Sequence, residues 1–65
     1  MNWIGRTFKC VYGLNYGDVF KVTTEPYNID RRGTKAVSGI SENAGELQIE
    51  VDELLSSIYW SEVRY

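Results

Sequence analysis

Hydrophobic and polar residues alternate along two segments of the chain, 6–12 and 46–52. A period of two residues is typical of a β-strand with one buried face. We therefore expect the apolar positions of both segments to face the interior. These positions are Phe8, Cys10, Tyr12, Leu47, Ile49 and Val51.

Three further segments are rich in β-branched and aromatic residues, which favour strands. They are residues 19–24, 34–40 and 58–65. Glycine, asparagine and aspartate gather in residues 13–18, which predicts a turn. Residues 25–33 contain the only proline and form the longest expected connection, a kind of loop that is often functional. Asp52 and the leucines that follow predict a single helical or 3₁₀ turn over residues 52–57.

Five short strands joined by tight turns predict an all-β fold, a small five-stranded antiparallel barrel with a short 3₁₀ turn before the last strand. Closing the sheet buries one face and removes the exposed edges. Phe8, Phe20 and Trp60 are the expected core residues. A chain of 65 residues is too short for a second domain, so we expect one domain over residues 1–65. An α+β fold with a longer helix over residues 50–57 stays open.

The composition excludes several classes of chemistry. The chain has no histidine, which removes the commonest general base and the commonest metal ligand. A single cysteine, Cys10, cannot form an internal disulfide, and its β-prone surroundings predict a buried thiol. No nucleophile and base pair is visible. We therefore expect a protein that is not an enzyme and that has no catalytic residues, no metal site and no cofactor.

The first residues lack the apolar core of a signal peptide, and no segment approaches the roughly 20 apolar residues of a membrane span. The expectation is a cytoplasmic protein with no membrane partner.

The net charge of −2 hides an uneven distribution, because residues 1–40 carry +3 and residues 41–65 carry −5. One candidate surface for a basic protein partner is an acidic face made of Glu46, Glu50, Asp52 and Glu53. The other interpretation is that these residues fill the outward positions of an edge strand and prevent pairing between molecules. Carboxylates that alternate along a strand lie about 7 Å apart, too far for a metal site.

Nine aromatic residues are a high load for this length, and a barrel of five short strands encloses about five or six of them. Trp3, Tyr16 and Tyr27, together with Tyr65, lie in expected loops or at a terminus. Exposed aromatic residues there are typical anchors of protein interfaces. The alternative is that they cap the ends of the barrel.

The only local basic cluster lies in the long loop, where Arg31, Arg32 and Lys35 follow Tyr27. Basic and aromatic side chains together are typical of single-stranded nucleic-acid binding. Solvated cations in a polar loop are the simpler interpretation, and the acidic second half would repel phosphate.

Four segments resemble, in order, small SH3-like barrel proteins encoded by bacteriophages and some bacteria. They are residues 9–11 (KCV), 14–22 (LNYGDVFKV), 42–46 (ENAGE) and 54–60 (LLSSIYW). The resemblance spans residues 7–63, and the longer charged loop at 26–33 departs from it. It implies an SH3-like barrel and a phage-type accessory protein in the host cytoplasm.

The resulting expectation is a non-enzymatic protein-binding module that inhibits or redirects a host protein of defence, transcription or nucleic-acid processing. Its surface would be the acidic strand face and the exposed aromatic residues. Two alternatives stay open. One is a nucleic-acid-binding barrel that uses the loop around Arg31 and Arg32. The other is a structural or homo-oligomeric module that associates through Trp3, Tyr65 or an edge strand.

Overall fold

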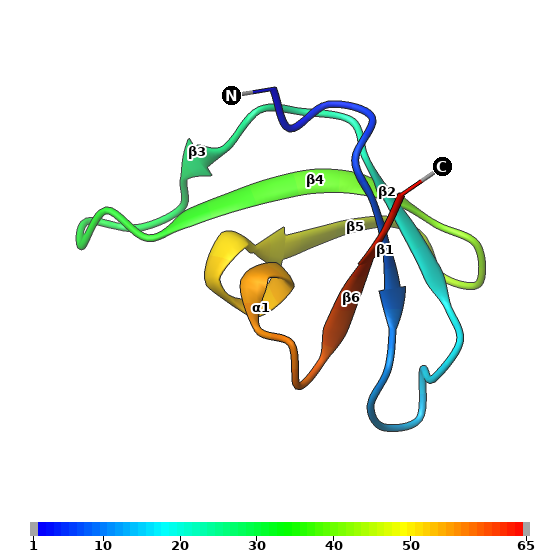
Figure 1. Cartoon of the computed structure of the whole chain (residues 1–65). Coiled ribbons are helices and arrows are strands. Elements are labelled where there is room, and N and C mark those ends of the chain that lie inside the picture. Colours follow the sequence, from blue (N-terminus) through cyan, green and yellow to red (C-terminus); the bar gives the residue numbers. More distant parts are fainter. Residues whose placement is uncertain (1, 65) are drawn as a thin grey trace.

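The computed structural model describes residues 2–64, which form six strands and one short helix (Figure 1). The strands are β1 (Thr7–Cys10), β2 (Val19–Val22), β3 (Tyr27–Asn28), β4 (Lys35–Ser41), β5 (Gly45–Glu50) and β6 (Trp60–Val63), and the helix is α1 (Val51–Leu55). Every strand pair in this part of the chain is antiparallel.

The long strand β4 organises the sheet. It pairs with β5 from Ala36 to Ser41, while its other edge is shared by β3 at one end and β2 at the other. The pairing then continues from β2 to β1 and from β1 to β6. Figure 1 shows β4 and β5 crossing behind the sheet formed by β2, β1 and β6. The two parts enclose the core between them.

The predicted all-β class is confirmed, but the strand count and the closure differ from the expectation. The strand that was not expected is β3, which lies inside the long loop. Its two residues are too few to leave a pattern in the sequence. The sheet is open because, within residues 2–64, β5 and β6 do not pair. The helix α1 packs against β4, β5 and β6 at this opening.

The single helical turn predicted before the last strand is present as α1, which covers five residues and begins at Val51, one residue earlier than expected. The longer helix over residues 50–57 that the α+β alternative requires is not present. One local prediction is wrong. The strand β1 ends at Cys10, and Tyr12 is exposed instead of facing the interior. Among the described residues α1 is the only helix, and its five residues are too few to cross a membrane.

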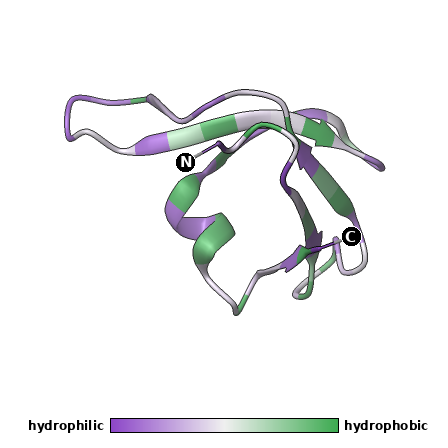
Figure 2. Ribbon diagram, turned by 45° about the horizontal axis from the view of Figure 1, so that its top comes forward, coloured by the Kyte–Doolittle hydropathy of each residue, from purple (hydrophilic) through white to green (hydrophobic). Residues whose placement is uncertain are grey.

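The core contains the three residues expected from the sequence, Phe8, Phe20 and Trp60, which are all buried. Cys10 is buried as predicted. Gly39 lets the strands approach closely, because a Cβ atom there would collide with the Lys21 carbonyl oxygen and the Phe20 ring. Figure 2 shows apolar and polar residues interspersed along the strands and around the helix, as expected for elements with one face on the core.

Candidate functional site

Trp3 lies at the end of the sheet where β1 begins, and it is only 8% exposed. Its ring stacks on that of Phe8 with centroids 6.1 Å apart, and the Arg6 guanidinium carbon lies 4.1 Å from the Trp3 ring centroid. The prediction of Trp3 as an exposed partner anchor is therefore wrong. A tryptophan just before the first strand can reach the edge of the core, and burying its large apolar ring there is more favourable than leaving it in solvent.

Charged side chains fix this end. Arg6 donates two hydrogen bonds to the Glu62 carboxylate, from Nε at 2.8 Å and from Nη2 at 2.7 Å. These bonds lower the pKa of Glu62 and raise the pKa of Arg6. The Glu25 carboxylate accepts hydrogen bonds from the backbone N–H groups of Trp3 and Ile4. We call Trp3, Arg6, Glu25 and Glu62 the closed end, because aromatic packing and ion pairing satisfy these groups internally.

The opposite end of β1 and β6 exposes large apolar side chains. Tyr12 and Tyr59 meet edge to face with centroids 5.5 Å apart, and Tyr12 is 61% exposed. Tyr16 is 70% exposed, and Leu14 is completely exposed. We call this cluster the aromatic end; its members are Tyr12, Leu14, Tyr16, Ile58 and Tyr59.

The loop that carries most of the aromatic end is held at its base. The Cys10 N–H donates to the Asp18 carbonyl at 2.8 Å, and the Gly17 N–H donates to the Cys10 carbonyl at 2.8 Å. Gly17 has a φ of 90°, a backbone conformation that favours glycine. The exposed residues between these bonds therefore project from a fixed turn.

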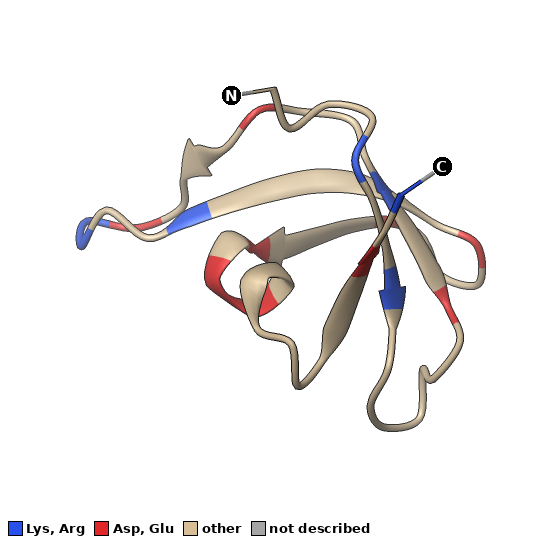
Figure 3. Cartoon of the chain, viewed as in Figure 1, with Lys and Arg blue, Asp and Glu red and all other residues tan. Residues whose placement is uncertain are grey.

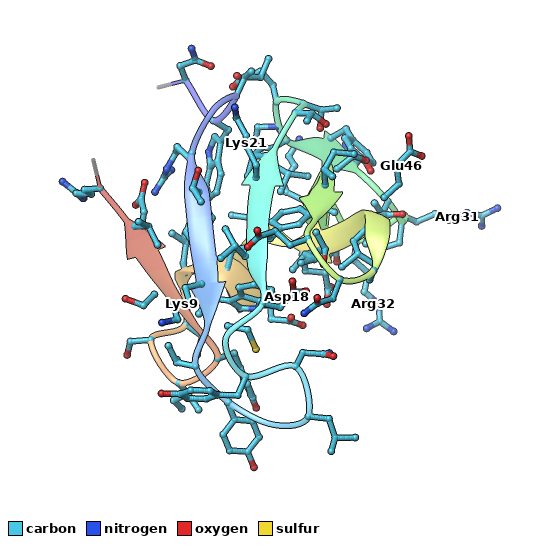
Figure 4. The ribbon with its side chains drawn as sticks, turned by 90° about the vertical axis from the view of Figure 1, so that its right-hand side faces the viewer. Lys9, Asp18, Lys21, Arg31, Arg32 and Glu46 are labelled. Carbon is cyan, nitrogen blue, oxygen red and sulfur yellow. The ribbon has the colours of Figure 1, made fainter. Side chains whose placement is uncertain are left out.

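Asp18 anchors the same loop to the β4–β5 turn. It is buried, and its carboxylate accepts hydrogen bonds from the Ser41 hydroxyl and from the backbone N–H groups of Val19 and Asn43. Figure 4 labels Asp18 just before β2. In residues 11–18 and 56–59 Asp18 is the only acidic residue, and there is no basic one. The aromatic end is therefore an apolar surface without an exposed charge.

Among the described aromatic residues that were predicted as anchors, only Tyr16 lies at this end. Tyr27 is half-buried on β3, and its hydroxyl is 2.6 Å from Ser38 Oγ. Tyr65 lies outside the described residues. Tyr12 and Tyr59 were not predicted as surface residues, because their contact depends on the pairing of β1 with β6, which spacing in the sequence does not show.

The acidic face is only partly free. Glu46 and Glu50 are exposed on β5, and Asp52 is exposed on α1. Glu53 has a structural contact, since its Oε2 accepts a hydrogen bond of 3.0 Å from the Trp60 indole N–H. Figure 3 shows acidic residues around α1 and the adjoining end of β5. This region is available to a basic partner surface, but it is a different region from the aromatic end.

The basic loop is an ordered turn between β3 and β4. Asp30 Oδ1 accepts hydrogen bonds from the N–H groups of Arg32 at 2.9 Å and Thr34 at 3.1 Å. Two hydrogen bonds from Thr34 lower the pKa of Asp30, and the bond from the hydroxyl has a larger effect than the bond from the N–H. Figure 4 shows the side chains of Arg31 and Arg32 extending away from the body.

Lys35 is also exposed, at the start of β4, so this loop presents three cations. Tyr27 lies on the neighbouring strand β3, where it is half-buried and its hydroxyl is 2.6 Å from Ser38 Oγ. The predicted nucleic-acid site therefore has three exposed cations beside a half-buried aromatic residue.

Within residues 2–64 no three Asp, Glu, Cys or His side chains come close enough to hold a metal ion. Comparisons with protein-family models, with curated proteins and with solved structures found no match to this chain.

Proposed function

We propose that this chain is a non-enzymatic protein-binding module and that the aromatic end is its binding surface. The observation that carries the proposal is the exposure of five large apolar side chains at one end, with Leu14 completely exposed. Exposed apolar clusters of this kind mark interaction sites, and tyrosine is enriched in protein interfaces. The turn is fixed by hydrogen bonds at its base, so little ordering is needed when a partner binds.

The proposal also covers the fold. We propose a partly open SH3-like barrel, in which the first strand pairs with the last strand and a helical turn precedes the last strand. The order of β1, β2, β4, β5, α1 and β6 supports it, and β3 is then an addition within the long loop. The phage-type, host-directed role rests on the resemblance over residues 7–63 and is part of the proposal.

The free acidic residues have a secondary role in this proposal. Glu46, Glu50 and Asp52 would attract a partner with a basic surface beside its apolar contact. Charges at the rim of an interface act mainly on the rate of association and on its dependence on salt.

Capture from a lysate of the source organism, or of its host, tests the proposal. The tagged full-length chain should retain a protein in stoichiometric amount, and nuclease treatment should leave the yield unchanged. Leu14→Asp should abolish this capture, because it places a charge in the centre of an apolar contact. Ile4→Asp is the matched control, since Ile4 is also exposed but lies next to the closed end.

Retention that depends on nucleic acid would contradict the proposal, as would equal capture by the wild-type chain and the Leu14→Asp variant. A mass of twice the monomer that Leu14→Asp abolishes, without a captured protein, would favour the homo-oligomeric alternative.

A further inference from the structure

A groove of about 270 Å³ opens between α1 and β6, beside the aromatic end. It is lined by Phe8, Leu54, Leu55, Ser57, Trp60, Ser61 and Glu62. Phe8, Leu54 and Trp60 also belong to the core, so the floor of the groove is apolar. Small-molecule pockets typically measure about 300–1,000 Å³. The smaller groove suits a few side chains of a polypeptide.

The groove follows the edge of β6 that faces away from β1, where α1 packs against part of the strand. Side chains alternate between the two faces of a strand, so Trp60 and Glu62 lie on one face and Ser61 on the other. The groove contacts all three residues and therefore runs along the edge of the strand. Within residues 2–64, β6 pairs with β1 alone. Figure 4 shows β6 as the outermost strand on its side of the sheet.

Backbone groups of β6 point into this open edge. The Val11 N–H donates to the Tyr59 carbonyl at 2.8 Å. This bond shows that the backbone of Tyr59 faces β1. In an antiparallel ladder the direction alternates from residue to residue, so the backbone of Trp60 and Glu62 faces the opposite side. There the Trp60 N–H already donates to the Ser56 carbonyl at 3.2 Å. The Glu62 N–H and C=O remain directed at the open edge.

The charge of the groove limits what can enter it. Glu62 is the only acidic or basic residue in the lining, and it is paired with Arg6. The groove thus carries no unpaired charge and favours an uncharged segment. Residues 41–65, which include α1 and β6, carry −5, which disfavours acidic residues at the outward positions of that segment.

We propose that this groove receives an extended segment of a partner protein, which pairs with β6 as an additional strand. Residues at every second position of the segment enter the groove and are apolar, and the residues between them are neutral or basic. The inference rests on the proposed function and specifies how the partner is held. The two surfaces are continuous, because residues 57–59 belong partly to the groove and partly to the aromatic end.

A displayed library of short linear peptides, selected on the full-length chain, is the probe. Chemical synthesis can place a methyl group on the backbone nitrogen of Glu62, which removes the edge donor and leaves every side chain unchanged. Leu55→Asp alters the apolar wall. Its matched control is Ile4→Asp, because Leu55 is 59% and Ile4 is 52% exposed. Circular dichroism then checks that each altered chain is folded.

The selected peptides should carry apolar residues at alternate positions. Their affinity should fall by about tenfold or more on methylation of Glu62 and on Leu55→Asp, and it should not change with Ile4→Asp. On binding, hydrogen exchange at the Glu62 amide should slow.

Peptides that bind the methylated chain equally well would overturn the inference. A selection that yields no peptide, from a chain whose aromatic end still captures a protein through Leu14, would overturn the inference and leave the proposed function standing. A dimer that methylation of Glu62 dissociates would also overturn it, because the occupant would then be a second copy of the chain.

Discussion

The two ends of the sheet use aromatic residues in opposite ways. At the closed end, Trp3 is covered by Arg6, which is itself paired with Glu62. At the aromatic end, Tyr12 and Tyr59 contact each other but stay open to solvent. The difference teaches that the number of aromatic residues does not show whether an end of the sheet is covered or open to solvent. The distinguishing feature is whether nearby charged groups cover the rings.

The largest expected effect is on stability at the closed end. Trp3→Ala should lower the free energy of unfolding by about 3–5 kcal/mol, because it removes a large buried side chain. Leu14→Ala at the aromatic end should change it by no more than about 0.5 kcal/mol. Urea denaturation of both variants measures the contrast. Similar losses at the two ends would mean that Leu14 packs against the protein in solution.

The next largest effect concerns Asp18, which anchors the loop that carries most of the aromatic end. Asp18→Ala should lower the free energy of unfolding by about 1–3 kcal/mol, because buried donors such as the Ser41 hydroxyl lose their acceptor. It should also weaken partner capture more than its stability loss explains, since the turn is no longer fixed. Urea denaturation and capture by the same variant provide the two values. Capture at the wild-type level by a folded Asp18→Ala chain would show that binding does not need the ordered turn.

A smaller effect concerns the pH dependence of the closed end. The hydrogen bonds from Arg6 hold the pKa of Glu62 below its ordinary value of 4.5 in the folded state. The pair therefore stabilises the fold above the unfolded-state pKa, and this stability is lost as the pH falls below about 4.5 and through the lower folded-state value. We expect Glu62→Gln to lower the free energy of unfolding by about 1 kcal/mol at neutral pH.

Denaturation of wild type and Glu62→Gln at pH 7 and at about pH 3 gives the comparison. The gap between the two proteins should shrink at the lower pH. A gap that does not change with pH would mean that the Glu62 carboxylate gains nothing from its charge.

The smallest expected effect lies in a third region, the loop of Arg31 and Arg32. The double substitution Arg31→Glu and Arg32→Glu should leave both stability and protein capture unchanged, because both side chains extend into solvent (Figure 4). Binding of the wild-type chain to single-stranded nucleic acid at low salt, abolished by this substitution, would instead favour the nucleic-acid alternative.

Local patterns in the sequence were enough to predict the main strands and the buried positions of Phe8, Phe20 and Trp60. The short ladder of β3 was not predictable, because two residues carry no periodicity. The candidate site was harder to predict, because its parts are distant in the sequence. The contact between Tyr12 and Tyr59 depends on strand pairing.

The burial of Trp3 likewise depends on Arg6, which is held by Glu62, 56 positions further along the chain. Glu53 was predicted as part of the acidic face, and the sequence does not show that its carboxylate accepts a hydrogen bond from the Trp60 indole.

The central claim is that a partner protein covers the aromatic end, and hydrogen exchange of the chain with and without its captured partner tests it most directly. The account predicts that binding slows exchange in residues 11–18 and 56–59 and leaves residues 29–35 unchanged. Slower exchange confined to residues 29–35 or to β5, with the aromatic end unaffected, would contradict the account.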